Sequence, residues 1–265
     1  NKIEGDEGRL PLDASKNTAG IAIIKFLEAI GAESQGFEMD LKKLMPLGSG
    51  LGSSAASSVA GVFAANELLG RPLAQKDLLP FAMEGEFIAC GSAHADNVGP
   101  SLMGGFTVIR SYDPLDIIQL RTPKELYATI VHPHIEVNTK DARNILKREI
   151  SLKKTITQMG NVAGLVAGLM LPDYDLISRS LVDVIIEPVR AILIPQFDVV
   201  KNAALENGAL GCSISGSGPS MFALSKDFDT AQKVGKAMQE GFSKVGIDSD
   251  CYVSGINQAG PVVIG

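Results

Sequence analysis

Apolar residues recur at helical spacing in two stretches near the start of the chain. Residues 21–30 end at Gly31, a residue type that commonly closes helices, and residues 55–69, rich in small and apolar side chains, end at Gly70. Between them, residues 37–42 alternate apolar and polar side chains with the period of a strand that has one buried side. Because such alternation is typical of antiparallel sheets, we expect two buried helices and an antiparallel strand.

The remainder of the chain mixes the same two patterns. Glycine-rich and polar segments separate them, and the character of the sequence changes around Pro123. We therefore expect an α+β protein with two domains, residues 1–123 and 124–265. Further helices are expected from Asp77 onward and at 139–146, 150–171, 199–206 and 230–245. Further strands are expected at 104–109, 126–131 and 250–254, and residues 212–224 are expected to hold a glycine-serine loop followed by a short strand.

Composition describes a globular enzyme without a membrane span or a nucleic-acid surface. The 265 residues are 45% hydrophobic and 20% charged, and the net charge of -6 opposes binding to phosphate backbones. No apolar run reaches the roughly 20 residues that span a bilayer, and the first residues lack the apolar core of a signal peptide. Cys90, Cys212 and Cys251 fit neither a disulfide framework nor a zinc site, so we expect a protein of the reducing cytoplasm.

The segment 46–57, with the sequence PLGSGLGSSAAS, is the most informative in the chain. Its closely spaced glycines let the backbone approach a ligand with its amide groups turned inward. The helix that follows is expected to have a serine at its N-terminus and to add amide donors and the positive end of its dipole. Such an arrangement can bind polyphosphate.

Three other interpretations of this loop compete. A Walker-type phosphate loop needs a lysine followed by Ser or Thr after its last glycine, and here Gly52 is followed by serines without a lysine. Gly50, Gly52 and Ala55 nominally satisfy a dinucleotide fingerprint, yet the preceding strand alternates where a central parallel strand would be continuously apolar. A glycine turn without function is the third interpretation, and it applies to the loop taken alone.

A second glycine-serine loop lies at 211–220, with the sequence GCSISGSGPS. Alone it reads equally well as a hairpin connection. In this order, however, the two loops resemble the second and third signature motifs of the GHMP kinases. The resemblance implies a ribosomal-protein-like N-terminal domain that binds ATP and a ferredoxin-like C-terminal domain whose glycine loop faces the phosphate site.

Three further stretches resemble the homoserine kinase family within the GHMP kinases: 92–97 (SAHADN), 137–143 (VNTKDAR) and 187–195 (EPVRAILIP). The similarity spans almost the whole chain from Asn17 onward. It implies transfer of the γ-phosphate of ATP to the side-chain hydroxyl of L-homoserine, with Mg²⁺ as a cofactor. The product would be O-phospho-L-homoserine, a precursor for threonine biosynthesis.

The same resemblance implies roles for individual residues. Catalytic roles are implied for Ser54, Glu86, Asn97 and Arg143, and the magnesium ligands would be Ser54 and Glu86. ATP binding is implied for Asn17, Pro46, Gly48, Ser49, Gly50, Leu51, Gly52, Ser53 and Ser54. Homoserine binding is implied for His94, Asn97, Thr139, Arg143, Arg190, Gly216, Ser217 and Gly218.

The chemistry of these side chains is compatible with the implied roles, and also with ordinary structural roles on the surface or in turns. An arginine can bind both oxygens of a carboxylate in a fixed fork, which suits Arg143 and Arg190 to an amino-acid substrate. Outside the family context, Arg143 reads as a solvated helix residue and His94 as a turn histidine. Glu86 then reads as an exposed charge. Phosphoryl transfer needs positioning and charge neutralisation more than covalent work, so no general base is assigned.

Two other functions fit the same pattern. One is a GHMP kinase for another alcohol, such as a mevalonate-like, sugar or shikimate-like substrate, and the other is a noncatalytic nucleotide-binding relative. A homodimer is compatible with the resemblance. The first family motif, an N-terminal strand and turn, has no counterpart before Asn17. We therefore expect that N-terminal strands of the fold are missing, either because the sequence is a fragment or because the protein is a degenerate homologue.

Overall fold

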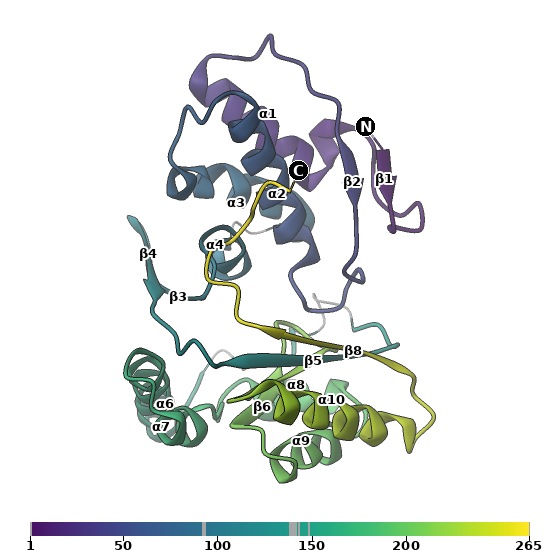
Figure 1. Ribbon diagram of the computed structural model, residues 1–265, viewed down its shortest axis with the longest axis vertical. Helices are drawn as coiled ribbons and strands as arrows, with labels where there is room; N and C mark the ends of the chain where they lie inside the picture. The colour runs from purple at the N-terminus through teal and green to yellow at the C-terminus, as the bar shows by residue number, and fades with distance from the viewer. Residues whose placement is uncertain (1, 92–93, 138–141, 143, 148, 265) are drawn as a thin grey trace. The chain divides into compact units, whose positions relative to one another are not determined.

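The computed structural model describes the whole chain except residues 1, 92–93, 138–141, 143, 148 and 265 (Figure 1). Its internal contacts divide the chain into two compact units. The first comprises residues 1–47, 52–119 and 257–265, and the second comprises residues 48–51 and 120–256. The domain boundary at 123–124 stays a prediction. The structure groups the first glycine loop with the second unit and the C-terminal tail with the first.

Helices dominate the first unit. They are α1 (Thr18–Ile30), α2 (Ser53–Leu68), α3 (Leu79–Cys90) and α4 (Ala95–Met103), with 3-10 turns η1 (Ala14–Lys16) and η2 (Gln75–Leu78). Their apolar faces meet in one cluster that includes Phe26, Val62, Leu78 and Leu102, all fully buried. Gly31 closes α1 in the left-handed conformation, as the sequence predicted. The helix α4 was not predicted, because its first residues read as a polar turn.

The strands of the first unit correct one prediction. Strand β2 (Asp40–Lys42) pairs with β1 (Lys2–Glu4) in parallel, so the antiparallel pairing expected from its alternation is wrong. The chain crosses through α1 between the two strands, and such a crossover is the connection that parallel strands require. Alternation reports that one side of a strand is buried, and it carries no information on strand direction. Strands β3 (Phe106–Tyr112) and β4 (Leu115–Leu120) form a separate two-stranded sheet.

The second unit contains a four-stranded antiparallel sheet in the order β6-β7-β5-β8. Its strands are β5 (Tyr127–Pro133), β6 (Gly211–Ile214), β7 (Met221–Ser225) and β8 (Ser249–Gly255). Val131 in β5 lies opposite Met221 on one side and Cys251 on the other. The predicted strands at 126–131 and 250–254 are therefore confirmed.

Helices α9 (Phe197–Glu206) and α10 (Phe228–Ser243) pack on each other and on this sheet. Both helices lie on one side of its strands β5 and β8 (Figure 1). Their core includes Val200, Val234 and Phe242, which are fully buried. The other helices are α6 (Leu152–Met170), α7 (Tyr174–Ser180) and α8 (Glu187–Arg190), followed by η3 (Ala191–Leu193). The predicted α+β class is thus confirmed. Among the helices described, none has both the length and the apolar character needed to cross a bilayer.

Candidate functional site

The first glycine loop connects β2 to α2 through three glycines in the left-handed conformation. Gly48, Gly50 and Gly52 have φ values of 66°, 76° and 75°, a region that residues with a side chain avoid. Ser49 between them is 1% exposed, and its hydroxyl accepts a hydrogen bond from the amide of Leu51 at 3.4 Å. The glycines are therefore needed for the shape of the loop itself.

The second glycine loop packs directly on the first. The hydroxyl of Ser215 donates to the carbonyl oxygen of Gly50 at 3.0 Å, and the amide of Ser220 donates to the carbonyl oxygen of Ser49 at 3.3 Å. A Cβ atom at Gly50 would lie 2.8 Å from the carbonyl oxygen of Gly218. The backbones of the two glycine loops are therefore in direct contact.

The helix α2 begins at a serine, Ser53, as predicted, but the residue that caps it is a glycine. The N-cap Gly52 has no side chain that could accept a hydrogen bond from the first amides of the helix. The hydroxyl of Ser53 donates instead to the carbonyl oxygen of Met45 at 3.3 Å. A left-handed glycine leaves the first turn of α2 without a competing side-chain acceptor. This suits the positive end of a helix to an anionic ligand.

Lys43 is a residue of this region that sequence reasoning missed. Its ammonium group donates to the carbonyl oxygen of Ser53 and to the hydroxyl of Ser57, both at 2.6 Å. Burial lowers the pKa of Lys43, while the carboxylates of Glu86 and Asp6 act to raise it. A lysine thus lies at the start of α2 although the Walker position after the glycines holds none. No local signal marks it, because Lys43 precedes the loop.

Ser54 and Glu86 lie on facing sides of α2 and α3. The hydroxyl of Ser58 donates to the carbonyl oxygen of Ala82 at 2.7 Å, which fixes the contact between the two helices. Ser54 precedes Ser58 by four residues and Glu86 follows Ala82 by four, so each lies on the contacting face of its helix. Glu86 is 7% exposed, so its exposed-charge interpretation is wrong. Ser54, in the first turn of α2, is partly exposed.

Three other predicted residues of the first unit have clear positions. The Asn97 side chain lies against the start of α2, because a Cβ atom at Gly52 would be 3.3 Å from its Oδ1. His94 precedes α4, and its ring packs edge-on against Tyr112 with centroids 6.4 Å apart. Asn17 is 4% exposed, and its Oδ1 accepts hydrogen bonds from the first amides of α1. Asn17 thus has a capping role, which the sequence did not assign to it.

Arg190 lies between two backbone segments of the second unit. Its Nε donates to the carbonyl oxygen of Ala142 at 3.0 Å, and its Nη1 donates to the carbonyl oxygen of Gly216 at 2.9 Å. The guanidinium group therefore supports the second glycine loop, a role that the sequence did not suggest. Thr139 and Arg143, and with them half of the helix predicted at 139–146, lie outside the described residues.

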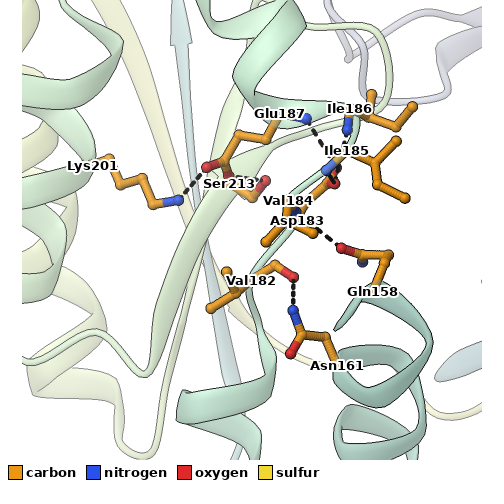
Figure 2. Close-up of polar contacts among 10 residues, drawn as sticks. All are labelled: Gln158, Asn161, Val182, Asp183, Val184, Ile185, Ile186, Glu187, Lys201 and Ser213. Carbon is orange, nitrogen blue, oxygen red and sulfur yellow. Dashed lines mark hydrogen bonds and ion pairs between the residues drawn. The ribbon is translucent and has the colours of Figure 1, made fainter. Parts of the chain in front are cut away.

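A buried ion pair anchors the helix that carries Arg190. Figure 2 shows the Glu187 carboxylate between the Lys201 ammonium group from α9 and the Ser213 hydroxyl from β6, which donates to it at 2.6 Å. The Asp183 carboxylate accepts hydrogen bonds from the backbone amides of residues 185–187 at 2.8 to 3.0 Å (Figure 2). Glu187 is 8% exposed. The ion pair thus joins α8, α9 and the strand that leads into the second glycine loop.

Removing the lysine of this pair is expected to lower the stability of the fold. Lys201→Met leaves the Glu187 carboxylate buried with a single hydroxyl donor, so urea unfolding should show a loss of about 3 kcal/mol in the free energy of unfolding. The double variant Glu187→Gln/Lys201→Met should lose much less, because no charge remains buried. Lys25→Met, which breaks an exposed pair with Glu28, is the control and should change the free energy by about 0.5 kcal/mol or less. A loss for Lys201→Met no larger than for this control would contradict the role.

His132 is a second residue that the sequence did not single out. Its Nδ1 lies 3.0 Å from the hydroxyl of Ser220, the last residue of the second glycine loop. Burial lowers the pKa of His132, and the neighbouring His134 lowers it further, whereas Asp250 opposes the shift. The imidazole is therefore neutral at physiological pH and acts as a hydrogen-bonding partner of the loop.

Two hollows of the structure do not lie at the predicted residues. One of about 750 Å³ lies between the end of α2, the 71–75 segment and the C-terminal tail, and one of about 600 Å³ lies beside 171–175. Neither is lined by a residue of the predicted site. Within the described part of the chain, no three His, Cys, Asp or Glu side chains gather as a metal site. The glycine loops and the start of α2 therefore remain the candidate site on geometry and chemistry.

Comparison with known proteins identifies the family. Residues 17–105 match the GHMP kinases N terminal domain, and residues 165–244 match the GHMP kinases C terminal domain. A homoserine kinase from Chloroherpeton thalassium is 54% identical over 270 aligned positions, which cover 100% of this chain and 85% of that protein. The chain belongs to the homoserine kinase family. The first glycine loop lies within the residues that match the N-terminal domain, and the second lies within those that match the C-terminal domain.

Solved structures of homoserine kinases and other GHMP kinases have the same fold. The crystal structure of homoserine kinase from Cytophaga hutchinsonii is 64% identical, with a TM-score of 0.97 over 100% of this chain and 84% of that one. Phosphomevalonate kinase from Streptococcus pneumoniae, solved with phosphomevalonate and AMPPNP, is 16% identical, with a TM-score of 0.67 over 94% of this chain and 83% of that one. The second likeness shows the fold alone. The two-domain GHMP kinase fold predicted from the sequence is confirmed.

Proposed function

We propose that this chain transfers the γ-phosphate of ATP to the side-chain hydroxyl of L-homoserine, giving O-phospho-L-homoserine and ADP. The observation that carries the proposal is the direct contact of the two family glycine loops, from Ser215 to Gly50, in a chain 54% identical to a homoserine kinase over its whole length. The free thiols of Cys212 and Cys251 support a place in the reducing cytoplasm.

The triphosphate is assigned to the first glycine loop and the start of α2. The backbone amides from Gly48 to Ser54 supply the donors, and the uncapped helix start adds its positive dipole end. The Lys43 ammonium group, held beside Ser53, adds a positive charge to the same helix start. ATP is the donor that GHMP kinases use, and these amides need no Walker lysine to hold it.

The residues present fit a magnesium ion. Magnesium is usually bound by one or two carboxylates together with substrate phosphates and water, so a large cage of protein ligands is not required. Glu86 offers a carboxylate buried against α2, and Ser54 offers a hydroxyl in the first turn of α2, on the side that faces α3. Magnesium would neutralise charge on the transferring phosphate. The role of this chain would be to hold Glu86 and Ser54 at the end of the phosphate loop.

The amino-acid substrate is assigned to the residues that the family resemblance implies. Arg143 is the proposed partner of the homoserine carboxylate, and Thr139, His94 and Asn97 would add polar contacts. The loop 216–218 would lie near the transferred group. Arg190 already donates to two carbonyl oxygens, so we propose that it mainly holds this loop and the Ala142 segment in place next to Arg143. Catalysis then rests on orientation and on stabilisation of the transition-state charge, without a dedicated base.

A coupled assay of ADP release against a panel of alcohols tests the substrate. L-homoserine is expected to give a kcat/KM at least about 100-fold above mevalonate, shikimate, galactose and L-serine, because a site built for one polar substrate rejects analogues that leave its groups unpaired. Formation of O-phospho-L-homoserine should be confirmed by mass spectrometry. Equal or higher activity with another alcohol would support a different GHMP kinase. Tight ATP binding without turnover of any alcohol would support a noncatalytic relative.

A further inference from the structure

A row of three polar side chains crosses the four-stranded sheet at the end of β5. His132 lies opposite Asp250 of β8. On the other side of β5, the neighbouring Val131 is paired with Met221 of β7. The next position of this antiparallel ladder places Ser220 opposite His132. Nδ1 of His132 lies 3.0 Å from the hydroxyl of Ser220. Because His132 is only 7% exposed and Ser220 is fully buried, the contact between them is shielded from water.

Ser220 connects the two glycine loops through its backbone. Its amide donates to the carbonyl oxygen of Ser49 at 3.3 Å, and its carbonyl oxygen accepts a hydrogen bond from the amide of Ser215 at 2.8 Å. The first bond reaches the first glycine loop, and the second closes the loop to which Ser220 itself belongs. The side chain of Ser220 contacts the imidazole of His132. His132 is thus joined to the first glycine loop by way of a single residue.

The bond between Ser220 and Ser49 orients an amide of the first loop. In a planar trans peptide, the carbonyl group of one residue and the amide group of the next point in opposite directions. Since the carbonyl oxygen of Ser49 is directed at the second loop, the amide of Gly50 points away from that loop. Gly50 is among the residues whose amides are proposed to bind the triphosphate. A shift of Ser220 would therefore turn one of the proposed donors.

The elements that pack on β5 bring few charges to His132. They are β7, β8 and α10. Helix α10 packs on the side of Val131, and successive residues of a strand point to opposite faces, so α10 does not face the imidazole. Residues 213–225, which include β7, contain no titratable side chain. In the described part of the chain, the groups that face His132 are Asp250 of β8 and the ring of His134, whose Nε2 lies 3.0 Å from Oδ2 of Asp250.

Protonation of His132 would disturb its contact with Ser220. Burial is the main cause that lowers the pKa of His132, His134 lowers it further, and Asp250 opposes the shift. The ring is therefore neutral at pH 7.5, where Nδ1 and the hydroxyl share one hydrogen bond. As the pH falls below the ordinary histidine pKa of about 6.5, a growing fraction of the rings becomes charged. A buried cation loses its hydration, so the charged ring moves toward water and away from the uncharged hydroxyl.

We propose that His132 is a positioning residue for the first glycine loop. Through the hydroxyl of Ser220 it holds the second loop against Ser49 and keeps the amides of the first loop aligned. The inference rests on the proposed function, in which these amides bind the triphosphate of ATP. His132 acts through Ser220 and has no contact with the nucleotide in this assignment. The alignment is complete at neutral pH and is lost as His132 becomes protonated in acid.

Substitution of His132 by leucine tests the contact at pH 7.5. His132→Leu leaves the buried hydroxyl of Ser220 without this partner, so the KM for ATP is expected to rise at least about 10-fold, while the KM for L-homoserine changes less than about 3-fold. Ser220→Ala should have a similar effect, and the double variant should be no worse than either single variant, because all three remove the same contact. The matched control is His134→Leu, which removes a histidine that is 51% exposed on the same strand and should leave both KM values within about twofold of wild type.

His132→Asn separates the hydrogen bond from the titration. An asparagine carries a hydrogen-bonding atom two bonds from Cβ, as the imidazole does at Nδ1, and it does not titrate in this pH range. Its KM for ATP should stay within about threefold of wild type at pH 7.5. Between pH 7.5 and 5.0, however, the KM for ATP of the wild type should rise at least about 3-fold more than that of the variant. Titration of ATP itself is common to both proteins and cancels in this comparison, and circular dichroism at each pH checks that both stay folded.

An unchanged KM for ATP in His132→Leu would overturn the proposal, as would additive effects in the double variant or an equal rise of the KM in acid for wild type and His132→Asn. A loss confined to the free energy of unfolding would also overturn it, since His132 would then have a structural role only. The dissociation constant for Mg-ADP, measured by calorimetry, separates these results from a failure of the proposed function. Weaker Mg-ADP binding by His132→Leu supports the positioning role even if the wild type phosphorylates no homoserine. Wild-type turnover of homoserine, with unaltered Mg-ADP binding by the variant, keeps the function and removes the positioning role.

Discussion

Glu86→Gln is expected to lower kcat at least about 100-fold while the protein stays folded. The substitution keeps the size of a side chain that is 7% exposed on α3 but removes the charge that is proposed to bind magnesium at the end of the phosphate loop. Steady-state turnover should be measured at several Mg²⁺ concentrations. The concentration needed for half-maximal activity should rise, because the metal loses its carboxylate ligand.

The matched control for this variant is Glu84→Gln. Glu84 lies on the same helix two residues away and is exposed, so the same chemical change should leave turnover and its magnesium dependence near the wild-type values. Wild-type turnover in Glu86→Gln would refute the metal role. A lower kcat with unchanged magnesium dependence would instead point to Lys43, whose pKa the Glu86 carboxylate acts to raise and which binds Ser53 and Ser57 at the start of α2.

Both glycine loops were found in the sequence because the requirement for glycine is local. A left-handed backbone is costly for any other residue, so the positive φ values of Gly48, Gly50 and Gly52 leave a direct trace in the chain. The main helices were found for a similar reason, since their apolar faces repeat within a few residues. Prediction therefore worked where the cause and the residue lie close together in the chain.

The missed features depend on contacts between distant segments. The hydroxyl of Ser215 reaches the carbonyl oxygen of Gly50 across 165 residues, and Ser213 reaches Glu187 across 26. No periodicity or spacing in a single sequence reports such pairs. The parallel direction of β2 was missed for the same reason, because it depends on where the chain returns after α1. The location of the site stays a prediction, and the contacts that hold its two loops could not be derived from the sequence.

Gly50→Ala is expected to disrupt the contact between the two glycine loops. A Cβ atom at this position would collide with the carbonyl oxygen of Ser215 and lie 2.8 Å and 2.9 Å from the carbonyl oxygen and amide nitrogen of Gly218. Backbone atoms cannot move aside as a flexible side chain can, so the loops must separate. We expect a loss of roughly 3 kcal/mol in the free energy of unfolding, about 1 from the left-handed backbone and about 2 from the displaced loops. The kcat/KM for ATP should fall at least about 100-fold, because the amides lose their alignment.

Gly48→Ala separates the two contributions, because Gly48 has a similar left-handed backbone with φ of 66° but open space where a Cβ atom would lie. It should lose only the backbone contribution of about 1 kcal/mol in urea unfolding. If the two variants were equally destabilised, the contact with Ser215 and Gly218 would contribute nothing to the fold. If Gly50→Ala lost stability but kept its kcat/KM for ATP, the loop contact would be structural only, and the triphosphate would have to bind elsewhere.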